Sequence, residues 1–100
     1  MSREERIKHF LNNAKSMTDY QIECELNNLL RDYSLRNLKD NRDLILDTIK
    51  KYKRAIRLGG LSRYTALMAY TKFYRKRAKL NLTKNDLDDL KEFFRLLRKR

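Results

Sequence analysis

Apolar residues recur at intervals of three and four along most of the chain, and this spacing predicts amphipathic helices. The first expected helix begins at Ser2, which precedes Glu5 by three residues as in a capping box. The second begins at Thr18, three residues before Gln21. The apolar positions are Ile7, Phe10, Leu11 and Ala14 in the first helix and Ile22, Leu26, Leu29, Leu30 and Tyr33 in the second. Each of these helices therefore has one face to bury.

Three further helices are expected after a short connection. The third opens near Asp40 or Asn41 and ends at Gly59, which suits a helix C-terminus, while Ser62 and Thr83 cap the fourth and fifth. Their apolar positions are Ile45, Ile49, Tyr52 and Ile56 in the third; Tyr64, Ala66, Leu67, Met68, Ala69, Tyr70, Phe73 and Tyr74 in the fourth; and Leu87, Leu90, Phe93, Phe94 and Leu97 in the fifth. Because apolar residues surround most of the fourth helix, we expect it to be the central one.

Composition supports a single helical domain over residues 1–100. The chain has no proline and only two glycines, so it has few of the residues that form the sharp turns between strands. We therefore predict an all-α protein, a small bundle of four to five helices. No apolar stretch reaches the roughly 18 residues of a membrane span, and the N-terminus is charged, so we expect a cytoplasmic protein with no membrane partner.

Positive charge is concentrated in the second half of the chain. Residues 1–50 hold nine Lys and Arg and nine Asp and Glu, whereas residues 51–100 hold sixteen and four. The net charge of +12 therefore belongs to the C-terminal half, and no acid occurs between Asp47 and Asp86. Charge needed only for solubility would not be so segregated, so this asymmetry predicts a polyanionic partner, with nucleic acid the first candidate.

The basic residues form two ridges at helical spacing. The expected nucleic-acid-binding residues are Lys50, Lys53, Arg54 and Arg57 on the third helix, Lys72, Arg75, Lys76 and Lys79 on the fourth, and Arg63 at the start of the fourth. The joint at Gly59 and Gly60 also fits the turn of a helix-turn-helix motif. Against that interpretation, Tyr64, Leu67 and Met68 are expected to be buried.

Residues suited to catalysis are scarce. His9 is the only histidine and Cys24 the only cysteine, and Asp86 is explained as the residue that completes a helix cap. General acid–base chemistry requires a tuned pair of groups in a pocket, and the sequence offers none. We therefore expect no enzyme activity, no metal and no cofactor.

Three short stretches carry a family resemblance. They are Tyr33-Ser-Leu-Arg-Asn-Leu-Lys-Asp40, Gly60-Leu-Ser-Arg-Tyr-Thr65 and Ala66-Leu-Met-Ala-Tyr-Thr-Lys-Phe-Tyr74. Over roughly residues 18–97, their order resembles the N-terminal core-binding (SAM-like) domain of tyrosine recombinases and phage integrases. The resemblance implies a helical domain that clamps duplex DNA, with Arg63 and Thr65 near the DNA backbone.

Two departures from that family limit what the resemblance implies. The helix expected from Ser2 to Lys15 is additional to the family's minimum, and Tyr20 follows Thr18 at the wrong spacing for the family's Thr-x-x-x-Tyr. The family's nucleophilic tyrosine and its Arg and His partners have no counterpart, so strand cleavage is not implied. The chain is then either a separate accessory protein or a fragment of a longer enzyme.

Duplex DNA is the ligand we predict, and DNA is favoured over RNA. One alternative is an RNA-binding or scaffold subunit. The other is a protein-interaction module, such as an inhibitor from a virus or mobile element, whose basic surface meets an acidic partner; self-association is also open.

Overall fold

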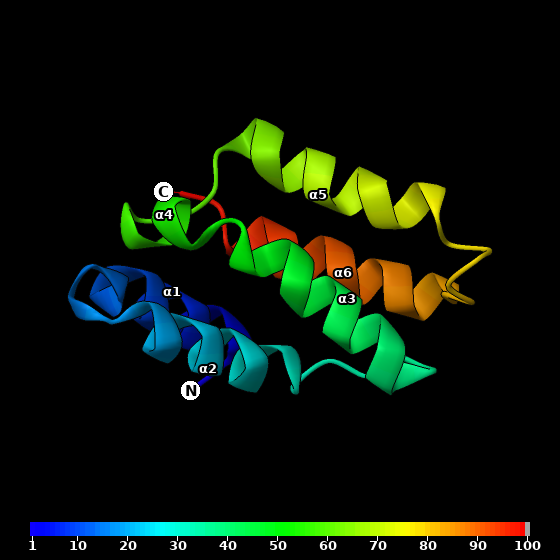
Figure 1. The fold of residues 1–100 in the computed structure, drawn as a ribbon, viewed down its shortest axis with the longest axis horizontal. Coiled ribbons are helices and arrows are strands. Elements are labelled where there is room, and N and C mark those ends of the chain that lie inside the picture. The colour runs from blue at the N-terminus through cyan, green and yellow to red at the C-terminus, as the bar shows by residue number, and fades with distance from the viewer. Residues whose placement is uncertain (100) are drawn as a thin grey trace.

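Six α-helices make up most of residues 1–99, the part of the chain that the computed structural model describes (Figure 1). They are α1 (Arg3–Asn13), α2 (Asp19–Leu30), α3 (Leu38–Lys50), α4 (Lys53–Arg57), α5 (Arg63–Arg75) and α6 (Lys84–Leu96), with a short 3-10 helix at Ala14–Ser16. The all-α prediction is confirmed. In the described range there is one helix more than expected, because the predicted third helix is divided into α3 and α4. No helix in residues 1–99 is long and apolar enough to cross a bilayer.

Side-chain caps begin α1, α2, α5 and α6 where the sequence predicts them. The predicted start of the third helix near Asp40 or Asn41 is wrong: α3 begins at Leu38, and neither α3 nor α4 has a side-chain cap. Thr18 and Thr83 each accept a hydrogen bond from the backbone of the third helical residue, and the side chains of Gln21 and Asp86 accept one from the backbone of the cap. At α1 only half of the box forms: the Ser2 hydroxyl accepts from the Glu5 amide and donates to the Glu5 carboxylate. Such caps satisfy amides that a helix start otherwise leaves without partners.

The core follows the predicted faces of α1, α2, α3 and α6. Every apolar position predicted for α1, α2 and α6 is buried. In the centre, Phe93 meets Tyr33 edge to face at 5.4 Å between ring centroids, and Phe94 stacks on Phe73 at 6.0 Å. Helix α6 contacts both α1 and α5 and lies between α5 and the pair α1 and α2 (Figure 1).

The break between α3 and α4 lies at Lys51 and Tyr52. The Tyr52 amide donates to the Ile49 carbonyl at 2.8 Å, a tightened turn that ends the regular ladder. Ile49 and Ile56 are both fully buried on either side of this turn, and Tyr52 is half-buried. The predicted apolar face is thus buried as expected, but the helix is not continuous.

The fourth predicted helix, α5, differs most from expectation. It lies on the outside of the bundle against α6, at the top of Figure 1, and not at the centre. Ala66, Ala69 and Phe73 are buried, but Tyr64 and Leu67 are 72% and 60% exposed. A helix that is apolar nearly all round can bury any side, so its pattern did not specify which side faces the core.

The joint between α4 and α5 is fastened by the segment that follows α6. Leu61 donates its amide to the Leu97 carbonyl and accepts from the Lys99 amide, both at 2.7 Å, which gives one parallel β-bridge. Gly60 makes this approach possible: a Cβ there would lie 2.7 Å from the Leu97 oxygen, and its φ of +132° disfavours other residues. Gly60 is therefore required by backbone contact as well as by the turn.

Candidate nucleic-acid interface

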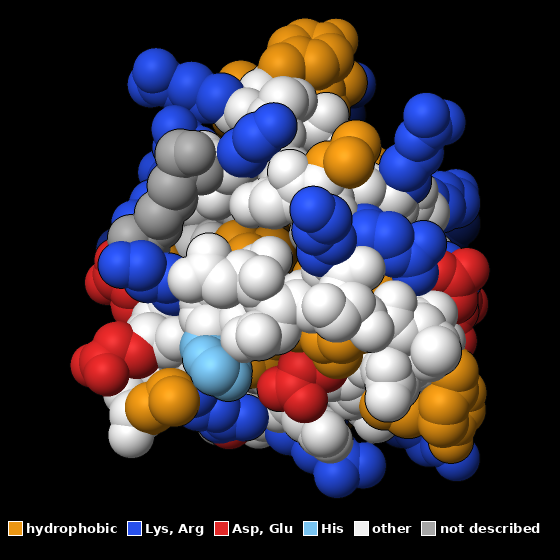
Figure 2. Space-filling view, turned by 90° about the vertical axis from the view of Figure 1, so that its left-hand side faces the viewer, with side chains coloured by type: hydrophobic (Ala, Val, Ile, Leu, Met, Phe, Trp, Pro, Cys, Tyr) orange, Lys and Arg blue, Asp and Glu red, His pale blue; other side chains and the backbone are white. Residues whose placement is uncertain are grey.

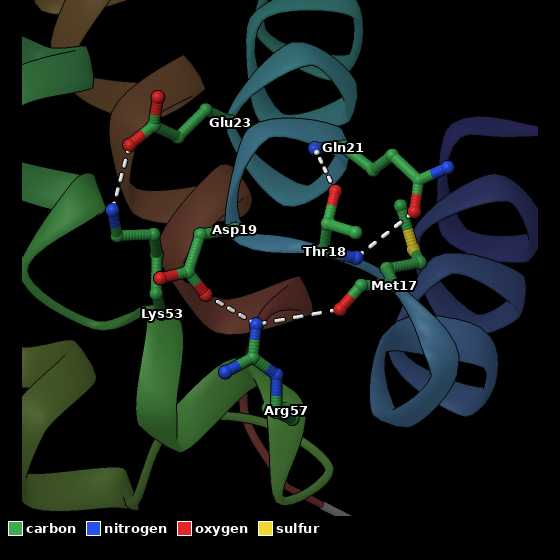
Figure 3. A network of polar contacts seen from close by, with 7 residues as sticks. All are labelled: Met17, Thr18, Asp19, Gln21, Glu23, Lys53 and Arg57. Atoms are coloured by element: carbon green, nitrogen blue, oxygen red, sulfur yellow. Dashed lines mark hydrogen bonds and ion pairs between the residues drawn. The ribbon is translucent and has the colours of Figure 1, made fainter.

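The first predicted ridge is engaged by acids of α2. Lys53 on α4 forms an ion pair with Glu23 at 2.6 Å (Nζ to Oε1). One turn later, the Arg57 guanidinium contacts the Asp19 carboxylate and donates to the Met17 carbonyl oxygen at 3.3 Å (Figure 3). These two cations therefore hold α4 against the start of α2.

The protonation equilibria of these groups reflect the pairing. The hydrogen bond and the charge of Arg57 lower the pKa of Asp19, and the hydrogen bond from Lys53 lowers the pKa of Glu23. The same hydrogen bond raises the pKa of Lys53. Each charged form is favoured by its partner, so the contacts are attractive at neutral pH.

The other members of the first ridge are arranged differently. Arg54 is exposed, and Lys50 is half-buried and close enough to Glu23 to help lower the pKa of that carboxyl. Neither cation has an ion pair within residues 1–99. The ridge thus exposes only part of its predicted charge to solvent. The compensating acids lie on α2, 30 residues before Lys53 and 38 residues before Arg57.

Within residues 1–99 the second predicted ridge has no acidic partners. Arg75 and Lys76 are exposed and Lys72 is half-buried, and none of them has an ion pair in the described part of the chain. The helix ends at Arg75, so Lys79 lies in the turn beyond it and does not continue the ridge as predicted. Lys79 is nevertheless exposed and unpaired in residues 1–99.

Arg77 is a functional candidate that the spacing argument missed. Its guanidinium lies 4.1 Å from the centroid of the Tyr74 ring and donates to the Tyr74 carbonyl oxygen at 2.8 Å. Tyr74 in turn lies 6.0 Å from Tyr70, ring to ring. Arg77 falls outside the i, i+3, i+4 series, so only its place between Lys76 and Lys79 could have indicated it.

Arg63 belongs to a separate basic group. It lies at the start of α5, and with three cations from α6 and the segment after it, it surrounds a hollow between the two helices. The three are Lys91, Arg95 and Arg98. Because they are spaced by four and three residues, as on one face of a helix, the sequence could have indicated this third basic group.

The expectation that the first two turns of α5 are buried is wrong. They nevertheless lack the exposed polar residues that the recognition helix of a helix-turn-helix motif needs. Tyr64, Leu67 and Met68 were expected to be buried and are all exposed. Apart from Arg63 and Thr65, the exposed and half-buried residues of these first two turns are apolar and have few groups that could hydrogen-bond base edges.

Figure 2 shows the molecule from the end at which α5 begins, so the C-terminal end of α5 lies on the far side of this view. On the visible face, Lys and Arg side chains occur from top to bottom, whereas the Asp and Glu side chains lie in the middle and lower parts. The start of α5, at the top of this face, is therefore free of visible acids.

The candidate catalytic residues have ordinary structural surroundings. His9 is exposed and lies 3.3 Å from the side-chain amide of Asn13, and Cys24 is exposed. Asp86 is buried, and its carboxylate accepts from the Arg36 amide at 3.0 Å and the Thr83 amide at 2.9 Å. Asp86 therefore joins two backbone segments as well as capping α6.

Comparison of the chain with protein-family models, with curated proteins and with solved structures finds no match. The resemblance to the core-binding domain of tyrosine recombinases stays a prediction from the sequence.

Proposed function

We propose that the protein binds duplex DNA through phosphate contacts made by the basic residues at the C-terminal end of α5 and in the turn that follows. This surface, the α5 basic end, comprises Lys72, Arg75, Lys76, Arg77 and Lys79. The observation that carries the proposal is that no acid within residues 1–99 forms an ion pair with any of these side chains, whereas Lys53 and Arg57 are paired.

Phosphate binding suits the chemistry of this surface. Lys and Arg release counterions when they neutralise phosphates, which supplies affinity that does not depend on sequence. Base-specific binding needs side chains that reach donors and acceptors on base edges. The α5 basic end consists of cations on a helix end and a turn, so the proposed binding is through the backbone of the duplex.

The test is fluorescence anisotropy of a labelled duplex of about 20 base pairs at several salt concentrations. Five phosphate contacts give a slope near −4.5 in log K against log salt, or roughly a 500-fold loss of affinity between about 50 and 200 mM. Affinity that does not change with salt would contradict the proposal.

Single-stranded RNA is the second candidate ligand. It is favoured by the adjacent Tyr70, Tyr74 and Arg77 side chains, because bases stack on aromatic rings and guanidinium planes. Tighter binding of a single-stranded RNA than of the duplex, lost in Tyr74→Ala, would favour this candidate over duplex DNA.

A further inference from the structure

A hollow of about 350 Å³ lies between α5 and α6, and none of its lining residues belongs to the α5 basic end. Ala66 and Phe94, both buried, and the half-buried Tyr70 form its floor, and Leu67 borders it. Its basic rim consists of Arg63, Lys91, Arg95 and Arg98. A hollow with an apolar floor and a ring of cations binds a different kind of ligand from a surface made of cations alone.

Packed elements hold both parts of the hollow in place. Phe94 stacks on Phe73 across the α5–α6 contact, which fixes the floor. The β-bridge between Leu61 and Arg98 fixes the backbone that carries one rim cation. The floor of the site is therefore formed by the folded bundle and needs little ordering on binding.

The volume suits an apolar side chain. A cavity of about 150 Å³ holds a benzene molecule, so this hollow can take an aromatic or branched aliphatic side chain. Exposed apolar residues continue beyond it along α5, with Tyr64 72% and Leu67 60% exposed. Such an apolar surface with a polar border is typical of a binding site for an amphipathic helix.

We propose that this hollow is a docking site for an acidic amphipathic helix of a partner protein. One apolar side chain of that helix enters the hollow, and its flanking carboxylates pair with Arg63, Lys91, Arg95 and Arg98. None of the four cations has an ion pair in residues 1–99, so each is available to such a carboxylate. Arginine beside a carboxylate can form two parallel hydrogen bonds, which adds specificity.

Charge argues against the two other occupants. A second copy of the chain carries a net charge of +12 and would bring the same cations against one another in a symmetric contact. Nucleic acid gains little from the buried Ala66 and Phe94 of the floor or from Leu67 at its border, because its phosphates bind cations. A carboxylate-bearing apolar helix complements both parts.

The proposal is tested with a labelled helical peptide of about 16 residues that has Leu and Phe on one face and Glu beside them, and with a scrambled peptide of the same composition. Leu67→Glu and Arg95→Glu change the border and the rim of the hollow. Met68→Glu is the matched control on α5, and Lys76→Glu is the matched control for charge; neither residue lines the hollow. Thermal unfolding of each variant verifies that it is folded.

We expect the wild-type chain to bind the amphipathic peptide at least about tenfold more tightly than the scrambled one. Leu67→Glu and Arg95→Glu each weaken peptide binding about tenfold, and the two controls change it by no more than about twofold. For duplex DNA the order is reversed, because Lys76 belongs to the α5 basic end. If the wild-type chain binds the amphipathic peptide but not duplex DNA, the proposed function is refuted and this site still stands.

Four results would overturn the docking site. Equal affinity for the scrambled peptide would show attraction by net charge only, and unchanged affinity in Leu67→Glu would exclude use of the apolar border. Loss of DNA or RNA binding in Leu67→Glu would assign the hollow to nucleic acid. A dimer in sedimentation analysis that Leu67→Glu converts to a monomer would assign it to a second copy.

Discussion

The two basic helices on either side of the glycine joint, α4 and α5, differ in what their charges do. On α4, Lys53 and Arg57 face Glu23 and Asp19 and contribute to packing. On α5, Lys72, Arg75 and Lys76 have no acidic partner within residues 1–99. Similar runs of basic residues in the sequence thus correspond to a structural contact in one helix and an open surface in the other.

The largest contrast should appear in stability. Ile56 on α4 is fully buried, so Ile56→Ala should lower the free energy of unfolding by about 2–5 kcal/mol. Leu67 on α5 is 60% exposed, so Leu67→Ala should change it by less than about 0.5 kcal/mol. Urea unfolding measures both, and a large loss in Leu67→Ala would mean that α5 is covered in solution.

Reversing charge on α5 should have the next largest effect. Changing Lys72, Arg75 and Lys76 together to Glu should weaken duplex DNA binding by at least about 100-fold, because three phosphate contacts become repulsive. Anisotropy titrations at fixed salt measure the change.

The matched control for this reversal changes Lys8, Lys15 and Lys39 to Glu. These three are exposed and have no ion pair in residues 1–99, whereas Arg3 and Arg6 pair with Glu92 and Asp32 and would confound it. An equal loss in both triple variants would show a diffuse field and contradict a localised surface.

Removing the acids of α2 should make α4 resemble α5. In the double variant Asp19→Asn and Glu23→Gln, Lys53 and Arg57 lose their partners and become available to phosphates. We expect duplex DNA binding to strengthen by about three- to tenfold, with a steeper dependence on salt. The double variant Asp47→Asn and Glu25→Gln removes the same charge elsewhere, and an equal gain there would mean that only net charge matters.

Acid should weaken the α2–α4 contact and spare α5. The pKa values of Asp19 and Glu23 are lowered in the folded chain, so the unfolded chain takes up protons first as the pH falls. The stabilisation is complete above the ordinary carboxyl range and is lost as the pH falls through the lowered values. Thermal unfolding from neutral pH to about pH 3 should show a smaller decline in the double variant Asp19→Asn and Glu23→Gln than in the wild-type chain. Parallel declines would contradict this assignment.

How far the sequence predicts the fold depends on how many faces of a helix are apolar. The patterns at Ile22 and Leu90 belong to helices with one apolar face, so their buried sides could be predicted. The pattern around Leu67 allows several orientations, and packing against α6 selected one. The tightened turn at Tyr52 carries no proline or glycine to indicate it.

The candidate site was predictable only in part. Local spacing identified Lys72, Arg75 and Lys76, but the pairing of Lys53 with Glu23 joins residues about 30 positions apart and depends on how α2 and α4 pack. The hollow between α5 and α6 likewise requires both helices in place. Distances between separate helices are a property of the fold, and no local pattern contains them.

The bridge at Leu61 also bears on the order in which the chain can fold during synthesis. Its two backbone partners, Leu97 and Lys99, follow it by 36 and 38 residues. During synthesis α1 to α4 are therefore made before the partners of Leu61 exist. The bridge that positions Arg98 and the contact of Phe93 with Tyr33 in the core both require α6 and the segment after it. The first sixty residues alone can therefore complete neither the docking hollow nor the centre of the bundle.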